Sequence, residues 1–336
     1  MTRMRAVVWM SQPLADLVVR RVAAYEPICV RSAKEFLEAA KPVGTVAFLD
    51  AETLALVGEL SHVALTAYVI AVCSDQLAAA IGWLQPYPWV SSVVSAGMFE
   101  HPMIERHLDH VIRTGLSTDK PRLLDWLAGN VQGRRVRLTH ASKRASRIDK
   151  MAEFFESHQV GSRTLQHLRD AAEELLTNAF YDAPVAAGVI PGPVSRAKDI
   201  ALPEDNACDL AYGYYDEIAV VRVRDPFGAL SRRRLVEVLE RCARSDMSVD
   251  VDETMGGAGL GMWRIFSTAT FVAASVVKNR ETEILVGIAK KAKAGTKPFA
   301  FHLYFRESKK RKFWQVFKDE TTARPSIDHS VIIKRN

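Results

Sequence analysis

The chain has 336 residues, of which 48% are hydrophobic and 25% charged, and this composition excludes collagen-like, low-complexity and disordered classes. Its net charge of +6 is uneven: residues 1–115 hold 9 Lys and Arg against 11 Asp and Glu, whereas the remainder holds 36 against 28. A chain of this length can bury two cores, so the shift in charge predicts two domains with different partners.

Neither a secretory signal nor a membrane span is expected. The N-terminus contains only a brief apolar run, and the longest mostly apolar stretch, 63–73, is too short to cross a bilayer. The cysteines Cys29, Cys73, Cys208 and Cys242 form no CxxC pair. We therefore expect a cytoplasmic protein without a disulfide framework or a cysteine zinc site.

Residues 1–115 alternate short apolar runs with amphipathic segments. Continuous apolar strands separated by helices indicate a parallel sheet that is covered on both faces. The expected strands are 5–10, 28–30, 45–49, 67–72 and 90–94, and the expected helices are 13–24, 33–40, 53–60, 76–84 and 103–113. The sequence therefore predicts an α/β first domain.

A linker at 116–133, with a short helix at 123–127, is expected to lead to a second domain at 134–306, and a basic tail at 307–336 ends the chain. The expected elements of the second domain are a strand at 135–139, helices at 145–156 and 162–181, a loop at 183–207, a hairpin at 209–215 and 218–224 that turns at Asp216 and Glu217, a polar segment at 231–255, a helix at 262–270 and strands at 271–278, 283–289 and 299–306. This order predicts an α+β sandwich with helices on one face of a mixed sheet.

A carboxylate and an amide share one stripe of the helix expected at 162–181. Glu174 and Asn178 are four residues apart, a step that turns about 40° beyond a full revolution. An amide oxygen is a hard ligand that suits Mg²⁺, and a carboxylate one turn away can take a proton from a nucleophile. A solvated helix face is the alternative.

The hairpin's second strand leads to Asp225, which is followed by Pro226, Phe227 and Gly228. A carboxylate at a strand end can accept a hydrogen bond from an exocyclic amine, which distinguishes adenine from guanine. Gly228 would let the backbone and a ligand approach closely. An ordinary Asp-Pro turn is the alternative.

Glycines cluster just before the last expected helix. Gly257, Gly259 and Gly261 can expose backbone N–H groups at a helix N-terminus and so form a phosphate cradle. Leu260 stands between the last two. A dinucleotide fingerprint starting at Gly257 would need glycine where Met262 stands, and the Gly-Lys-Ser/Thr of a P-loop is absent. A flexible hinge is the remaining alternative.

Together, three segments resemble the N, G1 and G2 boxes of the histidine-kinase-like (Bergerat-fold, GHKL) ATPases. The segments are Glu174-Leu-Leu-Thr-Asn178-Ala179, Asp225-Pro-Phe-Gly228-Ala-Leu230 and Gly257-Ala-Gly259-Leu-Gly261. They follow the family's order: 47 residues separate Asn178 from Asp225, and 32 separate Asp225 from Gly257. The resemblance covers about residues 134–290.

The resemblance implies ATP and Mg²⁺ as ligands. Asn178 would hold Mg²⁺, Asp225 would read adenine, and Glu174 would be the general base. Gly228 and the segment formed by Gly257, Gly259, Leu260 and Gly261 would complete the nucleotide site.

Two departures from the family's pattern bear on the catalytic rate. Phe227 stands where the G1 box usually has glycine, and Tyr181 and Asp182 stand where histidine kinases carry a basic residue.

The layout resembles most closely the compact anti-sigma-factor serine kinases. A sensor histidine kinase needs a phosphoacceptor histidine on a helical hairpin, whereas His140 ends a strand and His167 has no proline after it. His107 and His110 belong to the first domain and are expected to be structural. A gyrase-type transducer domain would not fit in the remaining length.

The first domain resembles a response-regulator receiver, with Asp50 at the end of the third strand and Ser74 after the fourth. Phosphorylation there needs an acidic pair after the first strand and a lysine after the fifth. This chain has Ser11 and Gln12 after the first strand, and the segment after the fifth strand begins with Ser95. A flavodoxin-like pseudo-receiver that contacts a partner protein is therefore expected.

These expectations combine into a signal-transduction protein that binds ATP and Mg²⁺ and phosphorylates serine or threonine on a partner protein. Arg232, Arg233 or Arg234, in a lid at 231–255, could neutralise developing charge. The alternative is a nucleotide-dependent binding module without useful turnover. Partners would bind through the receiver-like domain or the lid, and a homodimer is compatible with the sequence. Nucleic-acid binding by the tail is a weaker alternative.

Overall fold

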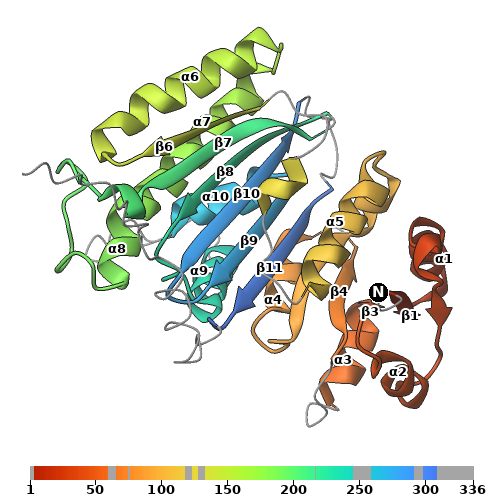
Figure 1. The fold of residues 1–336 in the computed structure, drawn as a ribbon. Helices are drawn as coiled ribbons and strands as arrows, with labels where there is room; N and C mark the ends of the chain where they lie inside the picture. The colour runs from red at the N-terminus through yellow and green to blue at the C-terminus, as the bar shows by residue number, and fades with distance from the viewer. Residues whose placement is uncertain are drawn as a thin grey trace, which may run out of the picture. The chain divides into compact units, whose positions relative to one another are not determined.

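The computed structural model describes residues 4–59, 66–74, 76–117, 123–127, 133–215, 217–244, 259–290 and 298–308. The strands in these ranges form one mixed sheet of eleven strands, in the order β2-β1-β3-β4-β5-β11-β9-β10-β8-β7-β6 (Figure 1). The fold is therefore α/β with a single sheet, whereas the sequence predicted two. The strands are β1 (Arg5–Trp9), β2 (Ile28–Cys29), β3 (Thr45–Leu49), β4 (Tyr68–Cys73), β5 (Val90–Ser95), β6 (Arg134–Leu138), β7 (Cys208–Tyr215), β8 (Ile218–Asp225), β9 (Phe271–Val277), β10 (Glu281–Ala289) and β11 (Ala300–Arg306).

Helices cover both faces of the sheet. The longer ones are α1 (Gln12–Arg21), α2 (Ala33–Ala40), α3 (Ala51–Glu59), α4 (Leu77–Gly82), α5 (Ile104–Leu116), α6 (Arg144–Ser157), α7 (Ser162–Thr177), α9 (Arg232–Arg244) and α10 (Leu260–Thr268). Helices α1 and α5 and the short helix Leu123–Leu127 pack on one face, and the others pack on the opposite face. Within the described ranges, no helix combines the length and apolar character needed to span a bilayer.

The two hydrophobic cores lie on the two faces of the sheet, and each contains residues from both halves of the chain. We call 4–117 the first half and 133–308 the second half. Residues Met1–Arg306 form one compact unit. The linker and tail boundaries stay predictions, and most of the tail lies outside the described residues.

The first half is a parallel sheet in the order β2-β1-β3-β4-β5. Every residue of β3 and β4 is buried, as the continuous apolar runs predicted, because helices cover both faces. The short edge strand β2 is exposed along its length.

In the second half, β11 pairs in parallel with β9, and the remaining neighbours are antiparallel. The hairpin β7–β8 forms as predicted, with Asp216 of its turn outside the described residues. The polar segment predicted at 231–255 contains the helix α9, and α10 begins two residues before its predicted start. The segment predicted as a loop at 183–207 begins with the short helix α8 (Ala183–Ala186) and contains a 3-10 helix at Glu204–Asn206, so the prediction holds only between them.

Strand β11 joins the two halves, because it pairs antiparallel with β5. A buried polar chain crosses this seam: the hydroxyls of Tyr68 and Ser92 lie 2.5 Å apart, Ser92 Oγ lies 2.7 Å from His302 Nδ1, and His302 Nε2 lies 2.9 Å from His107 Nε2. Burial lowers the pKa of His107 to about 3. Both imidazoles are therefore neutral, structural groups, as predicted for His107.

Trp126, in the predicted linker, is only 1% exposed. Its ring lies over His107, Phe271 and His302, with centroids 5.6 to 6.2 Å apart. The short helix of the linker is therefore part of the core on this face of the sheet.

Buried ion pairs run across β6, β7, β8 and β10. Arg135 lies 2.7 Å from Asp209, and Arg224 lies 3.6 Å from the same carboxylate and 2.9 Å from Glu281. Asp209 is only 2% exposed, so its charge depends on these arginines.

Candidate functional site

Helix α7 brings the predicted carboxylate and amide together. Its apolar stripe, which includes Leu168 and Leu175, is buried against the sheet, and the next turn, Asn178–Asp182, is a π-helix. Asn178 Nδ2 donates a hydrogen bond of 3.2 Å to Glu174 Oε1, so the amide oxygen points away from the carboxylate. A single π turn inside a helix is frequent at functional sites.

Glu174 lies in an environment that disfavours its charge. Burial raises the pKa of Glu174, and the nearby carboxylates of Asp182 and Glu173 act in the same direction. The hydrogen bond from Asn178 and the charge of Arg196 oppose this shift. A carboxyl with a raised pKa is better matched to proton transfer near neutral pH than an exposed one.

Asp225 is the last residue of β8 and is only 7% exposed. Its Oδ1 accepts hydrogen bonds from the backbone N–H groups of Phe227 and Gly228, at 2.9 and 3.4 Å, so the Asp-Pro turn that was the alternative interpretation does form. Burial nevertheless raises the pKa of Asp225 to about 6. Both backbone hydrogen bonds of the turn go to Oδ1.

Two neighbours of Asp225 could not be recognised from the sequence. Thr282 stands directly opposite Asp225 in the β8–β10 register, and its hydroxyl favours the ionised carboxylate. Cys208 begins the strand on the other side, its pKa is raised by burial and by the charge of Asp225, and its Sγ donates to the carbonyl of Ala179 at 3.8 Å. Cys208 thus contacts the turn that begins at Asn178 and lies near enough to Asp225 to be affected by its charge.

Gly228 has a positive φ of 60°, as expected of a glycine in this turn. A Cβ atom here would overlap the backbone of the β9–β10 turn, at Val277 O and the N–H groups of Arg280 and Glu281. The close approach predicted for a ligand is therefore made by the chain's own backbone. Its contact with a nucleotide stays a prediction.

The glycine segment meets Glu174 at the start of α10. A Cβ on Gly261 would overlap the Glu174 carboxylate, and a Cβ on Gly259, whose φ is 76°, would overlap Val238 of α9. Leu260 is the first residue of α10. Gly257 lies outside the described residues. The N-terminus of α10 therefore lies next to the Glu174 carboxylate. Backbone N–H groups at a helix N-terminus are suited to bind an anionic ligand.

Of the three predicted arginines, one lies near this site. Arg234 lowers the pKa of Asp182 by its charge, and Arg196, from the loop after α8, lies 3.8 Å from the same carboxylate. Arg233 is 88% exposed and pairs with Glu237. Arg232 instead points to the first half.

Glu174, Asn178 and Gly261 therefore lie together, and Cys208 lies near both Asp225 and the turn that begins at Asn178. In the described part of the chain, no three His, Cys, Asp or Glu side chains gather so that they could hold a metal ion. The amide oxygen of Asn178 could hold an Mg²⁺ ion together with phosphate and water oxygens.

Asp50 is fully engaged by the chain itself. Its Oδ2 accepts from the Ser11 N–H at 2.7 Å, and its Oδ1 accepts from the N–H and hydroxyl of Thr53, at 3.0 and 2.9 Å. Burial raises the pKa of Asp50, but these hydrogen bonds outweigh it and lower the pKa. The carboxylate, 7% exposed, thus caps the start of α3.

No model of a protein family matches this chain, and no curated protein matches it.

Proposed function

We propose that the second half is a Bergerat-type nucleotide site that binds ATP with Mg²⁺ and phosphorylates a serine or threonine of a partner protein. The observation that carries the proposal is the contact of two of the three sequence motifs: Glu174 accepts a hydrogen bond from Asn178 and packs against Gly261. Asp225, buried at a strand end, would accept the exocyclic amine of adenine.

The proposed chemistry uses groups already in position. Glu174 would take the proton of the attacking hydroxyl, whose oxygen forms a bond to the γ-phosphorus as the bond to the bridging β–γ oxygen breaks and ADP leaves. Mg²⁺ would neutralise charge on the phosphate oxygens. The oxygen of Asn178 can hold that ion, because its amide nitrogen is the atom that bonds Glu174.

We further propose that the first half is a flavodoxin-like pseudo-receiver. Its strand order, β2-β1-β3-β4-β5, is the order found in that class. The hydrogen bonds to Asp50 support a structural rather than a phosphoacceptor role for this carboxylate.

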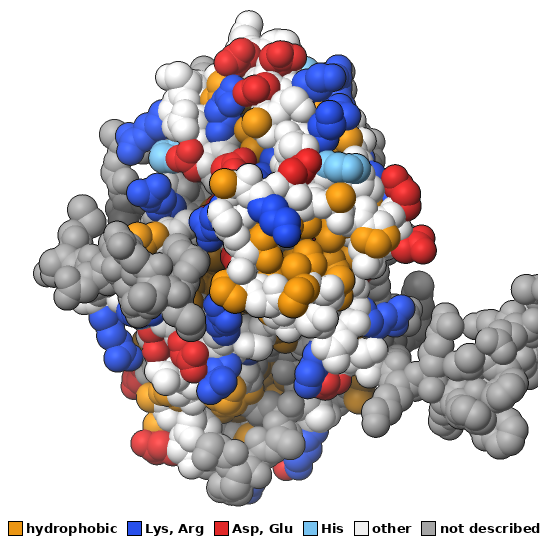
Figure 2. Space-filling model, turned by 90° about the vertical axis from the view of Figure 1, so that its left-hand side faces the viewer, with side chains coloured by type: hydrophobic (Ala, Val, Ile, Leu, Met, Phe, Trp, Pro, Cys, Tyr) orange, Lys and Arg blue, Asp and Glu red, His pale blue; other side chains and the backbone are white. Residues whose placement is uncertain are grey.

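A protein partner is supported by apolar side chains that are exposed on one side of the molecule. Figure 2 faces the side on which α8 and the following loop lie, and orange apolar side chains gather there. Val189, in that loop, is 51% exposed. Contiguous apolar surface of this kind is typical of interaction sites.

Glu174→Gln tests the kinase proposal, because glutamine keeps an acceptor for Asn178 and loses the base. We expect ATP affinity, measured by calorimetry with Mg²⁺, to change little, and phosphoryl transfer or phosphate release to fall about 10²- to 10⁴-fold. Glu156→Gln, an exposed glutamate of α6, is the matched control. Equal turnover in both variants would contradict the role of Glu174.

A nucleotide-dependent binding module is the second candidate, favoured by the self-satisfied Asp50 and by Phe227 in the G1 segment. In that case wild-type protein would bind ATP without releasing phosphate, and Glu174→Gln would retain ATP-dependent binding to a partner.

A further inference from the structure

Helix α9 touches both the candidate site and the first half. The apolar face of α9, which includes Leu235 and Leu239, is buried. On the site side, Val238 lies where a side chain on Gly259 would stand, and the charge of Arg234 reaches Asp182. The position of α9 therefore affects both the glycine segment and the charges near Glu174.

Arg232 ties the start of α9 to the first half. Its Nη2 donates to the backbone carbonyls of Leu84 and Val90, at 3.0 and 3.2 Å. These carbonyls flank the segment between α4 and β5. Arg232 is half-buried in this contact, whereas its neighbour Arg233 is 88% exposed and pairs within the helix.

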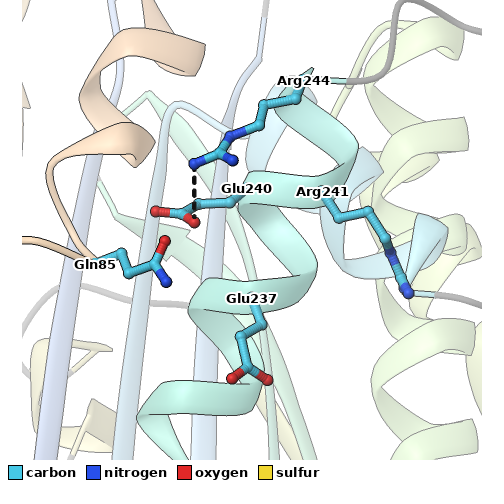
Figure 3. Close-up of a pocket in the computed structure, with 5 residues that line it drawn as sticks. All are labelled: Gln85, Glu237, Glu240, Arg241 and Arg244. Carbon is cyan, nitrogen blue, oxygen red and sulfur yellow. Dashed lines mark hydrogen bonds and ion pairs between the residues drawn. The ribbon is translucent and has the colours of Figure 1, made fainter.

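The later turns of α9 face the first half across an open pocket of about 540 Å³ (Figure 3). Gln85 lines it from the first half, and Glu237, Glu240, Arg241 and Arg244 line it from α9. Arg244 and Glu240 bond to each other, at 3.5 Å, rather than across the pocket.

We propose that Arg232 is a positioning residue through which the α4–β5 segment of the first half sets the place of α9, and with it the nucleotide site. The inference rests on the proposed nucleotide site and adds that the first half acts on it within the same chain. Because coupling is reciprocal, nucleotide binding must also alter the α4–β5 segment.

The test compares three variants of the full chain. Arg232→Met keeps the aliphatic stem and removes both hydrogen bonds, Arg232→Lys restores a cationic donor, and Arg233→Met is the matched control. Hydrogen exchange of α9 and of residues 83–90 is followed with and without ATP and Mg²⁺, and ATP affinity is measured by calorimetry.

In wild-type protein and Arg233→Met, ATP should slow exchange at 83–90. In Arg232→Met that response should disappear, and ATP affinity should fall roughly tenfold. Without nucleotide, hydrogen exchange in α9 should be about fivefold faster than in wild type, because a hydrogen bond that holds the helix is lost. Arg232→Lys should recover part of the response, because lysine can again donate a hydrogen bond. A residue that acted only through packing would show no such recovery.

The outcomes separate the two proposals. If ATP binds but exchange at 83–90 is unchanged, or if Arg232→Met behaves like Arg233→Met, the positioning role is overturned and the nucleotide site stands. If no nucleotide binds, the site proposal fails, and the exchange of α9 in the two variants decides whether Arg232 holds the helix.

Discussion

Replacing Asp225 by asparagine should make the protein more stable while removing ATP binding. The buried carboxyl has a pKa of about 6 in the folded chain, against 3.8 for an unperturbed aspartate, because burial disfavours its charge. A difference of about 2 units corresponds to about 3 kcal/mol of folding free energy lost when the group is ionised. Asparagine removes this penalty and can still accept the hydrogen bonds from Phe227 and Gly228.

The sign of the effect depends on pH. Well below the unfolded pKa of 3.8 the carboxyl is protonated in both the folded and unfolded states, so wild type and Asp225→Asn should be equally stable. Between that value and about pH 6 the unfolded state ionises while the folded state keeps its proton, so the advantage of the variant should grow with pH and be complete above about pH 6. At pH 8 that advantage corresponds to a rise of about 5 °C in the thermal midpoint.

Thermal unfolding of both proteins between pH 4 and pH 8, with ATP calorimetry at pH 7.5, measures both effects. Asp209→Asn is the control, because its buried carboxylate is already paired with Arg135 and Arg224, so this variant should show no comparable gain in stability as pH rises. A variant at 225 that is no more stable at pH 8 would refute the argument from burial. Undiminished ATP affinity in that variant would refute the adenine role.

Three further outcomes follow from the geometry. Gly261→Ala should weaken ATP binding, measured by calorimetry, because its methyl group overlaps the Glu174 carboxylate; unchanged affinity would mean that the carboxylate moves freely. Trp126→Ala should lower the free energy of unfolding in urea by about 3 to 5 kcal/mol, and a loss below about 1 would show that the short helix is not part of the core. Incubation with acetyl phosphate and Mg²⁺ should leave the mass of the protein unchanged, since Asp50 is held by Ser11 and Thr53; an added phosphoryl group at Asp50 would contradict this.

Local patterns predicted most of the elements and the contact of Glu174 with Asn178, because helical spacing alone places residues four apart on one face. Helix α9 was missed as a helix because its many charges hid the apolar positions Leu235 and Leu239. Thr282 could not be foreseen, since only the register of β10 against β8 places it opposite Asp225.

Long-range pairing left no signal in the sequence. Ser92 and His302 are 210 residues apart and meet only because β11 lies beside β5. The same pairing explains why the predicted linker contributes Trp126 to a core: the continuous sheet offers an apolar face on which it can pack. Gly228 and Arg232 were given ligand-directed roles because their true neighbours, the turn at Val277–Glu281 and the carbonyls of Leu84 and Val90, are also far away in sequence.

The place of β11 has a consequence for how the protein is made. The strand that completes the edge of β5 is the final strand of the sheet to leave the ribosome, so until then Val93 and Val94 stand on an open edge that can pair with another chain. A fragment ending near residue 117 would keep that edge permanently. Expression of the first half alone should therefore yield aggregates, and adding the β11 segment as a separate peptide should reduce them.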